Sequence, residues 1–137
     1  MYKIYEELKV LNLFSSTTVT ADVATTTGVS VEAYEDDALV IVQIGSVAST
    51  AATFAINVTA STVVGGVYSD IGTITTFTES GEDKIASIPV SLVGDNKFLK
   101  LDIDTTANAG TISAIIGAVI VVRPTIAEAD INSATPA

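Results

Sequence analysis

From Val29 onward, short runs of β-branched and other apolar residues alternate with turn-forming residues about every ten positions. This spacing is typical of short antiparallel strands in a sandwich or barrel. We expect at least seven strands, drawn from the ranges 29–34, 38–44, 53–59, 67–71, 73–77, 84–92, 97–104 and 112–122. The chain is therefore predicted to be an all-β antiparallel sandwich of about 7–9 strands, jelly-roll-like or immunoglobulin-like, with extended terminal arms.

The residue types agree with this prediction. Hydrophobic residues make up 48% of the chain and aromatic residues only 6%, so its core has to be built from aliphatic side chains. Ser and Thr contribute 31 of the 137 residues, and the β-branched Thr suits a pleated surface. A chain of this length fits one domain, which can bury roughly two-thirds of the surface of its unfolded form.

Several positions predict how the strands lie in the sheets. The ranges 38–44 and 112–122 are apolar on both faces, which indicates central strands. Pro89 moves its strand to a sheet edge or a bulge, and Gly72 suggests a bulge or bend. Period-two patterning makes 53–59 a half-buried strand, and it directs the charges at 100, 102 and 104 to water. The side chains expected inside are Phe54, Ile56, Val58, Leu99, Leu101 and Ile103.

The two ends of the chain differ from the 26–124 sandwich. Residues 1–25 are expected to form an N-terminal arm, and the pattern fits either a first strand or a short helix. Residues 125–137 are expected to be a C-terminal tail that is flexible or ordered only on assembly. Apolar residues in the first segment either pack on their own domain or contact a partner; the candidate contacts are Tyr2, Ile4, Tyr5, Leu8, Leu11 and Phe14.

The charge balance excludes two classes of partner. Sixteen acidic residues against six basic ones give a net charge of −10, which repels nucleic acid and anionic membranes. The acidic N-terminal residues predict no export signal. The longest apolar stretch, 115–122, is far shorter than the ~20 residues of a membrane-spanning helix.

The sequence contains few candidate catalytic residues. The chain has no His and no Cys, so we expect no catalytic residue, no cofactor and no enzymatic activity. Asp102 and Asp104 share a strand face and could form an acid–base pair, but exposed strands commonly have such a pattern.

A predicted acidic turn is the one candidate metal site. Glu35, Asp36 and Asp37, with Glu32 nearby, could offer oxygen ligands to calcium. Their spacing matches no calcium-binding loop, so a solvated turn is favoured and no bound metal is expected.

The order of features through segments 28–34, 38–45, 96–103 and 117–124 resembles that of small virion proteins of tailed bacteriophages. These proteins decorate or cement the outer surface of the head. The resemblance implies a virion structural protein, made in the host cytoplasm, that binds the major capsid protein and copies of itself. It implies a homo-oligomer, with a trimer favoured.

A second class of function stays open beside this one. β-Sandwiches often present binding sites in their loops, so the chain could be a carbohydrate- or receptor-binding module of a phage tail or fibre. Tyr34 and Tyr68 are its candidate aromatic contacts.

Overall fold

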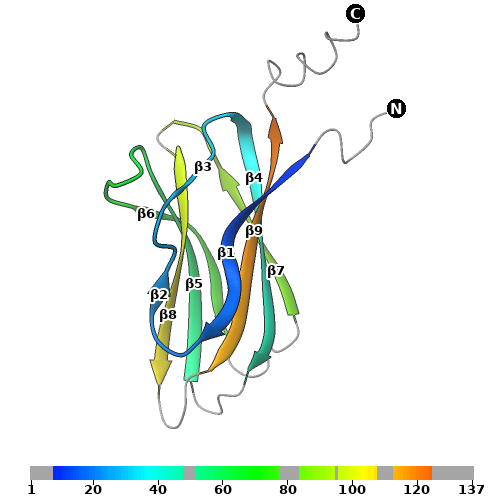
Figure 1. The fold of residues 1–137 in the computed structure, drawn as a ribbon, viewed down its shortest axis with the longest axis vertical. Helices are drawn as coiled ribbons and strands as arrows, with labels where there is room; N and C mark the ends of the chain where they lie inside the picture. Colours follow the sequence, from blue (N-terminus) through cyan, green and yellow to red (C-terminus); the bar gives the residue numbers. More distant parts are fainter. Residues whose placement is uncertain (1–7, 48–51, 78–83, 95, 108–112, 125–137) are drawn as a thin grey trace, which may run out of the picture.

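The computed structural model describes residues 8–47, 52–77, 84–94, 96–107 and 113–124, and all its regular elements are β-strands (Figure 1). Within these ranges every strand pairing is antiparallel. The strands are β1 Lys9–Val19, β2 Val23–Ala24, β3 Val29–Ser30, β4 Tyr34–Val47, β5 Ala52–Ser61, β6 Ser69–Phe77, β7 Lys84–Ser91, β8 Phe98–Ala107 and β9 Ala114–Pro124. The all-β prediction is confirmed.

The strands form two sheets that face each other. The first sheet has the order β1-β9-β4-β7, and the second has the order β2-β8-β5-β6, with β3 also paired to β8. The pairings are nested: β1 with β9, β2 and β3 with β8, β4 with β7, and β5 with β6. Two sheets joined in this way define a jelly roll, so the jelly-roll alternative is the one adopted.

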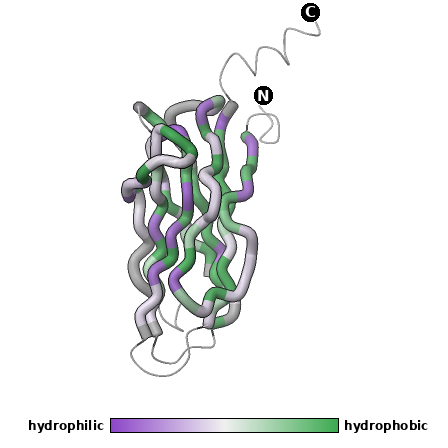
Figure 2. The backbone as a smooth tube through the Cα atoms, turned by 60° about the vertical axis from the view of Figure 1, so that its left-hand side comes forward, coloured by the Kyte–Doolittle hydropathy of each residue, from purple (hydrophilic) through white to green (hydrophobic). Residues whose placement is uncertain are grey.

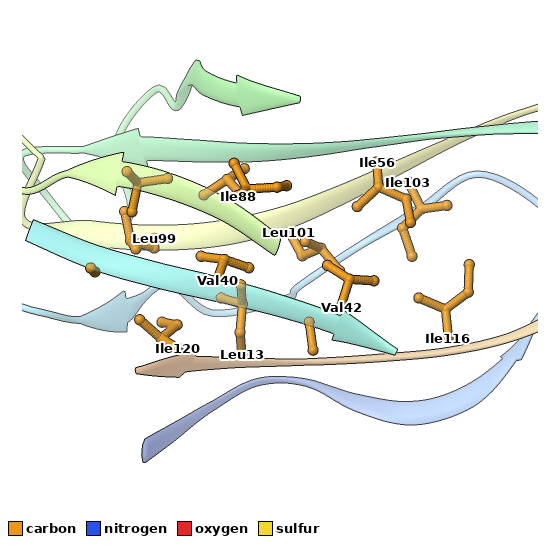
Figure 3. Close-up of a cluster of buried hydrophobic side chains, with 14 of the residues drawn as sticks. Leu13, Val40, Val42, Ile56, Ile88, Leu99, Leu101, Ile103, Ile116 and Ile120 are labelled. Atoms are coloured by element: carbon orange, nitrogen blue, oxygen red, sulfur yellow. The ribbon is translucent and has the colours of Figure 1, made fainter. Parts of the chain in front are cut away.

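The core lies between the two sheets and is aliphatic except for Phe54. Figure 2 shows hydrophobic and hydrophilic positions following one another along the strands, and Figure 3 shows side chains of both sheets meeting in the interior. All six residues predicted to point inward are fully buried. The central positions of β4 and β9 and the edge position of β7, which contains Pro89, also agree with the prediction.

Strand β5 is buried more completely than predicted. Its second face was expected to be open, yet Asn57, Thr59 and Ser61 are buried as well. The reason is that β5 lies between β8 and β6, whose side chains cover its polar face. Hydrogen bonds satisfy these buried groups; Thr59, for example, donates through Oγ1 to the Lys100 carbonyl at 3.5 Å.

Two predicted boundaries were wrong. Only Val29 and Ser30 of the predicted strand 29–34 pair with β8, and the chain turns at Glu32 and Ala33. The acidic residues 35–37 therefore lie within β4, where the register with β9 shifts between Tyr34 and Ala38. Val31 before the turn and Ala38 after it are both buried, which fixes the position of the turn between β3 and β4.

The ranges 67–71 and 73–77 also differ from the prediction, because they contribute to a single strand. β6 begins at Ser69, after a loop that contains Val67 and Tyr68, and it continues through Gly72. A Cβ atom at Gly72 would lie 2.5 Å from Ile88 Cγ2, so glycine lets β6 pack close to β7. The pairing of β6 with β5 shifts register beside Gly72, which confirms the predicted irregularity.

Strand β1 settles the alternative left open for part of the N-terminal segment. Residues 9–19 form a strand that pairs with β9 along its length, and Leu13 and Val19 are buried in the core. The pairing shifts register on both sides of Phe14, so β1 bulges around Ser16. Gly117 faces this bulge; a Cβ atom there would lie 3.1 Å from Ser16 Cα, so a side chain would require β1 to shift by a few tenths of an ångström.

Candidate functional site

The predicted partner-contact residues fall into two groups. Tyr2, Ile4 and Tyr5 lie outside the described residues, whereas Leu8 is half-buried just ahead of β1. Leu11 and Phe14 belong to β1 and are partly buried against the core. These last two residues are thus part of the sandwich, where the sequence analysis had placed them in an arm.

The start of the first strand and the end of the last strand lie at one end of the sandwich. Lys9, the first residue of β1, is paired with Val122 near the end of β9. Tyr34 at the start of β4 is paired with Pro124 at the same end (Figure 1). Residues 1–8 and the residues after Pro124 are therefore attached to the sandwich side by side.

The predicted acidic turn is described only in part. Asp37 and Glu32 are exposed, and the side chains of Glu35 and Asp36 lie outside what the structure describes. Among the described residues, no three acidic side chains come close enough to hold a metal ion.

Asp102 and Asp104 project from the outer side of the second sheet, as the alternation predicted. Asn57 donates from Nδ2 to Asp104 Oδ2 at 3.2 Å and accepts at Oδ1 from Thr73 Oγ1 at 2.9 Å. Desolvation raises the pKa of Asp102, and the charges of Asp104, Asp70 and Asp22 raise it further. Carboxylates are therefore concentrated on this side of the molecule.

Asp22 fixes the connection between β1 and β2 to the second sheet. Its Oδ1 accepts hydrogen bonds from the Thr105 backbone N–H and from Thr105 Oγ1, both at 2.7 Å. These bonds favour the carboxylate form, so they lower the pKa of Asp22.

The two tyrosines considered for ligand binding are engaged within the molecule. Tyr34 is half-buried against the core, and Lys9 Nζ lies 5.9 Å from its ring centroid. The Tyr68 hydroxyl donates to the Val64 carbonyl at 2.7 Å, and Lys100 Nζ lies 4.4 Å from its ring centroid. Burial raises the pKa of Tyr68.

The outer side of the first sheet is a surface that the sequence analysis missed. Leu39 in β4 lies opposite Val121 of β9 and Pro89 of β7, and Val121 lies opposite Val10 of β1, so one row of apolar residues crosses all four strands. We call this surface the outer apolar face; its apolar residues are Val10, Leu39, Ile41, Ile85, Pro89, Ile115, Val119 and Val121. Ile85 is 72% exposed and Leu39 is 36% exposed.

A hollow of about 260 Å³ opens in the middle of this face. Phe14 and Ser16 of the β1 bulge line one side, and Ile85 of β7 lines another. The floor includes Gly117 and Val119, so the missing side chain at Gly117 deepens the hollow. The sequence feature that indicates this surface is the apolar character of both faces of 38–44, which predicts burial on both sides. In the described structure, no layer covers the outer side of this strand.

The described part of the chain contains no helix with the length and hydropathy required to span a bilayer.

Comparisons with protein-family models and with curated proteins give no match. Among solved structures, the chain is similar to a chain of the T13 IBDV viral particle, with a TM-score of 0.49 and 12% identity over 85% of this chain. It spans only 31% of that viral chain. The similarity is one of β-sandwich architecture.

Two further solved structures are similar over most of their own length. The tobacco streak virus coat protein matches 91% of this chain and 92% of its own, with a TM-score of 0.39 and 10% identity. The C-terminal family 22 carbohydrate-binding module of Clostridium thermocellum Xyn10B matches 86% of this chain and 87% of its own, with a TM-score of 0.43 and 12% identity. The neighbours thus include viral capsid proteins and carbohydrate-binding modules.

Proposed function

We propose that this chain is a non-enzymatic structural protein of the virion, which binds the outer surface of a phage head and decorates or cements the capsid lattice. Its partners are the major capsid protein and further copies of itself. It is made in the host cytoplasm and acts without a cofactor. The resemblance of segments 28–34, 38–45, 96–103 and 117–124 to phage decoration proteins supports this proposal.

The observation that carries the proposal is that β1 begins and β9 ends at the same end of the sandwich. The register of Lys9 with Val122 attaches both segments to one end of a rigid sandwich. Tyr2, Ile4 and Tyr5 precede that end by only a few residues, and they supply the apolar groups for a contact with the capsid. A small contact suffices on a lattice, because neighbouring contacts made by one oligomer add through effective concentration.

Deleting residues 1–7 is expected to weaken binding to heads by roughly tenfold or more, as for loss of a central apolar contact. The cut leaves β1 whole, since this strand starts at Lys9. The measurement is co-sedimentation of the purified chain with heads that lack it. A triple variant, Tyr2→Ser, Ile4→Ser and Tyr5→Ser, should reproduce the loss with the chain length unchanged.

The matched control is Glu6→Gln with Glu7→Gln, which removes charge from the same segment and keeps its apolar residues. This control should bind as well as the unaltered chain. Equal binding by the deletion variant would remove the N-terminal contact from the proposal. Failure of the unaltered chain to bind heads would contradict the proposed function itself.

A further inference from the structure

The outer apolar face differs from the rest of the described surface in its charge. Among the described residues, its charged side chains are Asp37 and Arg123, both near the end where β9 stops. The second sheet and its connections carry Asp22, Asp70 and the pair in β8 on their outer side. Among the described side chains, the outer side of the first sheet thus carries one carboxylate, Asp37, whereas that of the second sheet and its connections carries four.

From this asymmetry we propose that the outer apolar face is the surface through which a second copy of this chain binds. Two copies repel each other wherever their acidic sides meet, and this repulsion is least where both surfaces are uncharged. The same face of a second copy is apolar, with Asp37 and Arg123 as its described charged residues, so it matches in both respects. The inference deepens the proposed function, which includes copies of the chain as partners, by naming the surface that joins them.

The size of the face agrees with such a contact. It spans four strands about 4.8 Å apart and about 20 Å along the strands between Ile115 and Val121, which gives roughly 500 Å² with the side chains at its margin. Two such faces together bury roughly 1,000 Å², the lower limit for a specific protein interface. An exposed apolar patch of this size is comparable to the largest patch on a typical monomer, and such patches are often functional.

The hollow in the outer apolar face can receive a side chain of the second copy. The hollow between Phe14 and Ile85 is open to a side chain from outside. Ile85 itself, 72% exposed, stands at the rim on an edge strand, where a second copy can reach it. We therefore expect Ile85 to be among the residues that contribute most to association.

The test is the mass of the chain in solution, measured by sedimentation equilibrium over a range of concentrations. The unaltered chain is expected to sediment as a multiple of its 14.1 kDa mass. Ile85→Glu should raise the dissociation constant by roughly tenfold or more, because it places a charged carboxylate in an apolar contact that excludes water. Higher salt should strengthen association of the unaltered chain, since it screens the net repulsion and leaves the apolar contact intact.

The matched control is Val67→Glu, which introduces the same charge at an apolar residue that is 88% exposed in the loop before β6. It should associate as the unaltered chain does. Leu39→Glu is a second test on a central strand, and circular dichroism of each variant checks that it is folded. A dimer that Ile85→Glu dissociates would support the inference.

The inference is overturned if the unaltered chain sediments as a single copy at every concentration, or if Ile85→Glu and Leu39→Glu associate as tightly as Val67→Glu. Capsid binding is measured separately on the same variants. A monomeric Ile85→Glu variant that still binds heads would leave the capsid contact in place and confirm the self-association surface, so the two proposals can fail independently.

Discussion

Replacing Leu13 by alanine is expected to lower the free energy of unfolding by about 2–5 kcal/mol. Leu13 lies in β1, which pairs along its length with β9, and its side chain is buried in the core between the sheets. Truncating it removes buried apolar surface and leaves a cavity that an antiparallel pair of strands cannot close. Urea denaturation followed by circular dichroism measures the loss.

The control for this prediction is Val63→Ala, in the loop after β5. Val63 is 58% exposed, so the change should alter stability by less than about 0.5 kcal/mol. A similar small effect at Leu13 would mean that β1 is not part of the folded core. The sandwich would then begin after residue 25, as the sequence alone suggested.

Replacing Asn57 by aspartate is expected to lower the free energy of unfolding by about 3 kcal/mol at pH 7. Asn57 is buried and donates to the Asp104 carboxylate, so the substitution replaces a hydrogen-bond donor with a like charge. The nearby Asp102, whose pKa is raised by desolvation and by neighbouring carboxylates, shows that this surface already disfavours negative charge.

The loss should depend on pH with a definite sign. Folding raises the pKa of the carboxyl at position 57, because burial and Asp104 both oppose its charge. The destabilisation is therefore complete above the raised pKa of the folded state. It decreases as the pH falls below that pKa, and it is lost near the ordinary pKa of an unfolded aspartate, about 4. Urea denaturation at pH 7 and at about pH 4 gives the comparison.

A charge exchange provides the control for position 57. Combining Asn57→Asp with Asp104→Asn restores one amide and one carboxylate, so the hydrogen bond can form with its partners reversed. Most of the stability should return at pH 7. A loss at position 57 that is equal at both pH values, or that persists in the exchanged pair, would contradict the electrostatic cause.

The strands and their inward faces could be predicted from the sequence, because successive side chains of a strand point to opposite sides. The alternation of Leu99, Leu101 and Ile103 with charged residues is such a pattern, and all three are buried. Pro89 likewise placed β7 at an edge, since it lacks the N–H that a second neighbouring strand would require.

The arrangement of those strands could not be predicted, because it depends on contacts between residues far apart in the chain. Nothing in the local pattern around Leu13 shows that β1 pairs with the last strand. The same holds for Asn57, whose burial results from the strands on either side of it. Residues 125–137, predicted as a tail, lie outside the described structure.

The outer apolar face was missed for a related reason. Apolar residues on both sides of 38–44 predict burial on both sides, and the second sheet covers only one of them. The sequence therefore contained the signal of a second buried surface. The proposal that another copy of the chain covers it reconciles the pattern of Leu39 and Ile41 with the structure.

Electron microscopy of purified particles tests the proposed function most directly, by comparing particles that contain this protein with particles that lack it. The proposed function predicts difference density on the outer surface of the head, in the shape of two packed sheets and repeated with the symmetry of the capsid lattice. Difference density confined to the tail, or none on the head, would contradict it.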